Sequence, residues 1–166
     1  MVQAACTTLL TVEKKVRNMS EPFQLVYQSE IMADSRSSIL KNVSEILCES
    51  RRHNVREGIT GMLIYYEQCF FQILEGEKLA VESLYSRIKL DNRHSYVSLI
   101  WKGDATRRIF PDWRMGYSVP SELDVEFEEQ LYSLRDLKQA TGSILGGPTI
   151  TEKLADWALS GVPLMH

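Results

Sequence analysis

Apolar and polar residues alternate along several short stretches of this chain, and two longer stretches repeat their apolar residues with helical spacing. The alternation over Phe23 to Gln28 predicts a first strand. A helix is expected next, because apolar residues then return every three or four positions. Asp34 or Ser35 can cap its start, and it should end near His53-Asn54, before Gly58.

The middle of the chain predicts a hairpin followed by a second helix. Ile59 to Tyr66 is rich in Ile, Leu and Tyr, and a two-residue turn separates it from Cys69 to Leu74, as is typical of two paired strands. Helical spacing of apolar residues follows over about Leu79 to Leu90. Two further strands are predicted over Val97 to Trp101 and Asp112 to Val119.

The order of these elements is the ferredoxin-like βαββαββ pattern of an α+β fold, with one strand added. We expect a five-stranded mixed sheet with two helices on one face and C-terminal helices on the other. Ser121 can cap one C-terminal helix, and Thr149 or Thr151 can open a last one that carries Leu154, Trp157 and Leu159. The predicted parts are an extension (1–21), a central domain (22–120) and a helical cap (121–166).

Composition narrows the class of protein. The chain has 166 residues, of which 44% are hydrophobic and 25% charged, and its net charge is -3. These values favour a globular protein without nucleic-acid or membrane partners. The spacing of Cys6, Cys48 and Cys69 indicates neither a metal site nor a disulfide framework, so we expect a reducing, cytoplasmic location.

A single amide in an apolar strand is the first sign of chemistry. Gln72 stands in the middle of Phe70 to Gly76, with two apolar residues on each side. A buried amide needs hydrogen-bond partners, because leaving it unpaired costs about 1–3 kcal/mol. Backbone groups or a buried water can supply them, and taken alone this structural role is the simpler interpretation.

Several polar motifs occur in a fixed order between residues 22 and 120. They are Val26-Tyr27-Gln28-Ser29, His53-Asn54, Gly58-Ile59-Thr60-Gly61, Phe70 to Gly76, Asp91-Asn92-Arg93-His94, and Arg107-Arg108 ahead of Phe110, Trp113 and Met115. Together they resemble the BLUF family, the blue-light sensors that hold FAD. The segment after residue 120 resembles the two-helix cap of short, stand-alone members.

The resemblance implies a set of contacts to non-covalently bound FAD. Asn54 would pair with the flavin ring edge, because an amide carries a donor and an acceptor side by side. Ile46 and Ile88 would cover the two ring faces. Each residue also has a structural alternative as a helix cap, a solvated charge or a core side chain. The implied set is Ile46, His53, Asn54, Gln72, Ile88, Asp91, Arg93 and His94.

The resemblance also implies the photochemistry. Tyr27 would give an electron and then a proton to excited flavin through Gln72, and the amide would then reverse its hydrogen bonds. Trp113 and Met115 stand two residues apart on the predicted fifth strand, and would therefore share one face and relay the change to the cap. Core packing is the alternative for both, and Arg107 and Arg108 are candidates for the phosphates or for a solvated loop.

We therefore expect a photoreceptor that signals to a partner protein, assembles as a homo-oligomer and is not an enzyme. Two alternatives remain at this point. One is a small ferredoxin-like acyl-phosphate hydrolase with Arg93 or Arg107 holding an anion, although no Gly-rich anion loop favours it. The other is a regulatory module for a different flat ligand, or a cofactor-free interaction subunit. A yellow purified protein would favour the photoreceptor.

Overall fold

The computed structural model describes residues 21–33, 35–119 and 147–160. The predicted N-terminal extension up to residue 20 and the helix proposed after Ser121 lie outside these residues. The described elements are β1 (Phe23–Ile31), α2 (Arg36–Glu57), β2 (Thr60–Tyr66), β3 (Cys69–Gly76), α3 (Lys78–Ile88), β4 (His94–Asp104), β5 (Gly116–Ser118) and α5 (Gly147–Ser160).

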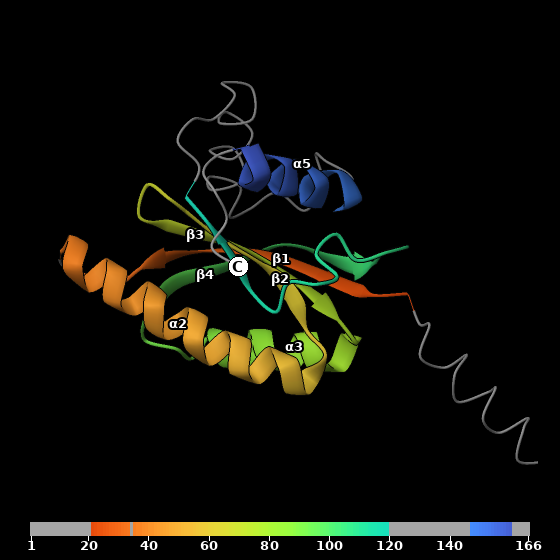
Figure 1. The fold of residues 1–166 in the computed structure, drawn as a ribbon, viewed down its shortest axis with the longest axis horizontal. Coiled ribbons are helices and arrows are strands. Elements are labelled where there is room, and N and C mark those ends of the chain that lie inside the picture. The colour runs from red at the N-terminus through yellow and green to blue at the C-terminus, as the bar shows by residue number, and fades with distance from the viewer. Residues whose placement is uncertain (1–20, 34, 120–146, 161–166) are drawn as a thin grey trace, which may run out of the picture.

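The strands form one five-stranded mixed sheet in the order β4-β1-β3-β2-β5. Neighbouring strands are antiparallel except β2 and β5, which are parallel. Helices α2 and α3 lie against one face of the sheet and α5 lies against the other, so the sheet is the middle of three layers (Figure 1). The ferredoxin-like α+β fold expected from the sequence is confirmed.

Local chemistry sets the element ends. The side chain of Ser35 accepts a hydrogen bond from the backbone N–H of Ser38, which makes Ser35 the N-cap of α2. The helix ends at Gly58, whose φ of 65° is left-handed and therefore suits glycine. Glu67 and Gln68 both have positive φ, as a two-residue hairpin turn between β2 and β3 requires.

Two apolar cores lie on the two faces of the sheet. Strand β3 is buried along its whole length, because it lies between β1 and β2 and is covered on both faces. Its side chains alternate: Phe70 and Leu74 belong to the core under α2 and α3, whereas Phe71 and Ile73 belong to the core under α5. The same alternation directs Gln72 toward α2 and α3.

The prediction for the fifth strand was wrong in its length, and so was the expectation that Trp113 and Met115 share one face of it. Strand β5 covers only Gly116–Ser118, so Trp113 and Met115 precede it. Met115 is buried in the core under α2 and α3, whereas Trp113 packs against the core under α5. The two side chains lie on opposite faces because the backbone before Gly116 is not strand, and the two-residue repeat of a strand does not apply to it.

Smaller differences occur at other element ends. Strands β1 and β4 are longer than predicted because Ile31 pairs with His94, which makes His94 the first residue of β4 and not part of a turn. Helix α5 begins at Gly147, ahead of both Thr candidates. Of the apolar residues expected on this helix, Leu154 and Trp157 are buried, whereas Leu159 is 50% exposed.

Candidate functional site

A cavity of about 170 Å³ opens between α2, α3 and the first residue of β4, with Gln72 of β3 in its lining. Its volume is below the roughly 300–1,000 Å³ of pockets that hold drug-sized ligands, so a dinucleotide would lie partly outside it. The predicted residues that line it are Ile46, His53, Gln72, Ile88, Asp91, Arg93 and His94. Glu49, Ser50, Leu84 and Arg87 also line it and were not predicted.

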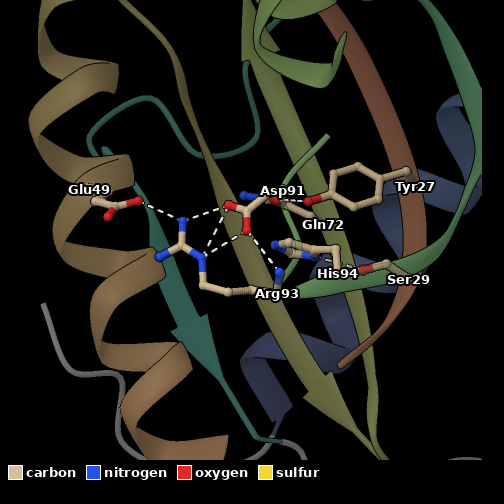
Figure 2. A network of polar contacts seen from close by, with 7 residues as sticks. All are labelled: Tyr27, Ser29, Glu49, Gln72, Asp91, Arg93 and His94. Carbon is tan, nitrogen blue, oxygen red and sulfur yellow. Dashed lines mark hydrogen bonds and ion pairs between the residues drawn. The ribbon is translucent and has the colours of Figure 1, made fainter. Parts of the chain in front are cut away.

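Tyr27 and Gln72 meet because they are directly opposite each other in the β1–β3 register. The Tyr27 hydroxyl donates a hydrogen bond to Gln72 Oε1, and both side chains are buried (Figure 2). The other end of the amide, Nε2, donates to the thioether sulfur of Met115 at 3.2 Å. Because a thioether is a weak acceptor, Nε2 can still turn to a stronger one.

Burial sets the ionisation of the Tyr27 phenol. Desolvation, with smaller contributions from Tyr85 and Asp91, raises the pKa of Tyr27 well above its ordinary value. The phenol therefore keeps its proton throughout the physiological range and remains a hydrogen-bond donor to Gln72. The ring of Tyr85, on α3, lies 5.4 Å from the Tyr27 ring between centroids.

Arg93 bridges the turn after α3 to helix α2 at the edge of the cavity. Its Nε and Nη2 atoms donate to the two carboxylate oxygens of Asp91 at 2.9 and 2.6 Å, and Nη2 also donates to Glu49 at 2.6 Å (Figure 2). The hydrogen bonds from Arg93 lower the pKa of Asp91. The guanidinium thus has a fixed orientation and remains charged.

The two histidines of the predicted set have different surroundings. His94 is buried, and its Nδ1 lies 2.9 Å from the hydroxyl of Ser29. Burial lowers its pKa to about 4, so the ring is neutral at physiological pH. His53 is partly exposed and contacts the guanidinium of Arg87 through Nε2. Its pKa is lowered by desolvation and by the charge of Arg87.

Asn54 is fully buried but does not line the cavity. Its Nδ2 donates to the backbone carbonyl of Arg114, while its Oδ1 has no hydrogen-bond partner among the described residues. A buried acceptor without a donor is costly, so a ligand N–H placed there would be favourable. The alternative role as helix cap is not what the structure shows, because the capping residue of α2 is Gly58.

The remaining candidates divide between the cavity and the far side of the sheet. Ile46 is buried on α2, and Ile88 is partly buried on α3, so apolar side chains from both helices line the cavity. Arg108 instead donates to the hydroxyl of Thr60 and to the backbone carbonyl of Glu75, and it does not line the cavity. These bonds hold Arg108 to β2 and β3.

Comparison with known proteins identifies one family. The family model described as BLUF, sensors of blue-light using FAD, matches residues 23–116, more than half of the chain. The chain is 36% identical over 75 residues to a photoactivated adenylate cyclase subunit beta of Euglena gracilis, which covers 45% of this chain and 9% of that protein.

A second relative and a solved structure are also similar to this chain. The blue light- and temperature-regulated antirepressor BluF of Escherichia coli K12 is 34% identical over 70 residues, 42% of this chain and 17% of that protein. The chain thus spans less than a fifth of the length of these two relatives. The structure titled BlsA photo-activated state superposes with a TM-score of 0.65 at 26% identity, covering 87% of this chain and 99% of that one.

Proposed function

The chain belongs to the BLUF family of flavin-using blue-light sensors, and we propose that it is a photoreceptor whose non-covalent cofactor is FAD. The observation that carries the proposal is the buried hydrogen-bonded pair of Tyr27 and Gln72 beside a cavity lined by polar and apolar groups. The two other uses considered for the fold, an acyl-phosphate hydrolase and a module for another ligand, are not favoured.

The donor set fits the edge of a flavin ring, where carbonyl oxygens and ring nitrogens alternate. Oδ1 of Asn54 would accept from a ring N–H, since this buried oxygen has no partner among the described residues. The guanidinium of Arg93 and Nε2 of Gln72 would donate to ring carbonyls. Ile46 and Ile88 would cover the ring faces.

Bound flavin would supply the blue-absorbing group and, once excited, an oxidant for a nearby phenol. Tyr27 holds its proton on the hydroxyl oxygen, and its hydrogen bond directs that proton to Oε1 of Gln72. The amide of Gln72 has two unlike ends, so rotation or a change of tautomer exchanges its donor and acceptor. The altered amide would then present a different partner to the sulfur of Met115.

Absorption spectra of the purified protein before and after blue light test this proposal. We expect a yellow protein that releases all its flavin on boiling and shows a reversible red shift on illumination. Tyr27→Phe and Gln72→Leu should keep the flavin but lose the shift. Tyr85→Phe is the matched control, because it removes the hydroxyl of a neighbouring phenol. The centroid of the Tyr85 ring lies 5.4 Å from that of the Tyr27 ring. A normal shift in the Tyr27 or Gln72 variant would overturn that residue's role.

We further propose that the output is a contact with a partner protein rather than a reaction performed by this chain, and that the chain is a cytoplasmic homo-oligomer. The name of one relative, an antirepressor, supports an output by this route. Within the described residues, none of the helices is long and apolar enough to cross a membrane.

A further inference from the structure

We propose that Arg51 is a positioning residue that holds the backbone of Met115 and so sets where the Met115 sulfur meets Gln72. The inference rests on the proposed function and deepens it. It starts from Arg51 on α2, whose Nε donates to the carbonyl oxygen of Met115 at 3.1 Å. The side chain is half-buried, and it does not line the cavity.

Arg51 is one of three donors that act on three consecutive carbonyls. The backbone N–H of Gly61 donates to Trp113 O at 3.0 Å, Asn54 Nδ2 donates to Arg114 O, and Arg51 donates to Met115 O. Arg51 and Asn54 stand three residues apart on α2 and therefore on one side of the helix. We name these three bonds the carbonyl clamp.

The clamp matters because residues 113–115 are not paired in a strand ladder within the described part of the chain. Strand β5 begins only at Gly116, so the backbone just before it depends on the clamp for its position. Met115 is 2% exposed, and its sulfur accepts from Gln72 Nε2 at 3.2 Å. A methionine side chain is unbranched and flexible, so a fixed backbone is what gives its sulfur a defined place beside the amide.

The clamp also includes a buried polar atom that a ligand could reach. Asn54 takes part with its Nδ2, while its buried Oδ1 has no partner among the described residues. A donor that arrives at Oδ1 would orient the whole amide, including the end that holds Arg114. Helix α2 therefore carries both cavity-lining residues and two residues that hold the backbone before β5, Arg51 and Asn54, neither of which lines the cavity.

Hydrogen exchange of the 166-residue chain, free of flavin, tests the clamp. Arg51→Met keeps the apolar stem and removes the N–H donors. We expect the amides of residues 113–118 to exchange at least fivefold faster in this variant than in the wild type. Arg52→Met is the matched control, since Arg52 is the exposed neighbour on the same helix and makes a weak contact with the sulfur of Cys48 at 4.0 Å. Arg51→Lys, which retains a donor, should exchange at an intermediate rate.

The flavin-loaded protein tests the positioning role. Arg51→Met should bind flavin within about threefold of the wild type but return from the illuminated to the dark spectrum at least threefold faster, because Met115 no longer constrains Gln72. Exchange no faster than in Arg52→Met would overturn the clamp. Faster exchange with an unchanged return rate would overturn the positioning of Met115. A wild type without a light response would instead refute the proposed function, and exchange alone would then decide the clamp.

Discussion

Two asparagines on the same helix allow a test of the site at the scale of one residue. Nδ2 of each donates to a backbone carbonyl, Asn54 to Arg114 and Asn42 to Met32. Asn42 is only partly buried, whereas Asn54 is buried and its Oδ1 has no partner among the described residues. Asn54→Ala should weaken flavin binding by about tenfold, the value of one hydrogen bond of about 1.4 kcal/mol. Asn42→Ala should not. Titration followed by flavin fluorescence measures both, and equal affinities would remove Asn54 from the site.

The buried His94 predicts how stability depends on pH. Its folded pKa of about 4 lies below the ordinary 6.5, so the unfolded chain takes up a proton first as the pH falls. The contribution of His94 to the free energy of unfolding is therefore fully present above pH 6.5. It is lost as the pH falls toward 4, by an amount on the order of 3 kcal/mol. His53 contributes in the same direction, whereas the lowered pKa of Asp91 acts only below its ordinary 3.8.

Urea unfolding of the cofactor-free chain at pH 7 and pH 5 measures this effect. His94→Gln keeps a polar partner for Ser29 and removes the titration, so most of the pH dependence should disappear, with the part due to His53 remaining. His53→Gln is the comparison variant, because its ring is partly exposed and should matter less. An undiminished loss of stability in His94→Gln would show that another group titrates.

At the scale of elements, close packing between β2 and β3 depends on one glycine. A Cβ on Gly61 would lie 2.0 Å from the carbonyl oxygen of Ile73, so alanine cannot enter without moving β3. Gly61→Ala should lower the free energy of unfolding by about 2–4 kcal/mol. Gly58→Ala has open space and only a positive φ to overcome, so it should cost about 1–2 kcal/mol. Equal losses in urea unfolding would contradict the close approach.

The contact of α5 with the sheet gives a second test at this scale. Trp157 is 6% exposed and packs edge-on against Tyr66 and Phe71, whereas Leu159 is 50% exposed. Trp157→Ala should destabilise the protein by about 3–5 kcal/mol. Leu159→Ala should change stability by no more than about 0.5 kcal/mol. If chemical unfolding gives similar values for the two variants, α5 is not held to the sheet as described.

Elements held by local patterns were predictable from the sequence, and the segment before β5 was not. Runs of apolar residues predict strands β1 and β3. The helical spacing of apolar residues and the capping residue Ser35 predict α2. Residues 105–115 are instead held by distant side chains: the carboxylate of Glu75 accepts from the backbone N–H groups of Ile109 and Phe110, and the carbonyl clamp holds the end. Such long-range hydrogen bonds produce no repeating pattern in the sequence. The two-residue repeat of a strand was therefore applied to this segment, and it wrongly predicted Trp113 and Met115 on one face.

At the scale of the whole molecule, the order of elements was enough to predict the layers of the fold. The motifs supply five residues of the cavity lining, because they lie near the end of α2, on β3 and between α3 and β4. These residues are His53, Gln72, Asp91, Arg93 and His94. Glu49, Ser50 and Arg87 were missed because each stands on a polar helical position that looks like ordinary surface; only their spacing from Ile46, His53 and Ile88 could have indicated them. The division of the chain into an extension (1–21), a central domain (22–120) and a helical cap (121–166) stays a prediction.

The last prediction concerns assembly. Strand β4 is at one edge of the sheet in the described residues, with Tyr96 70% exposed and Leu99 42% exposed along it. An edge strand with exposed apolar side chains is a ready site for a second copy. We expect sedimentation velocity at tens of micromolar to show a homo-oligomer whose size distribution changes under blue light, and Leu99→Lys to shift it toward monomer. Leu40→Lys, on the exposed side of α2, is the control. A monomer in darkness and in light would contradict the prediction, and equal effects of the two lysine variants would place the contact elsewhere than β4.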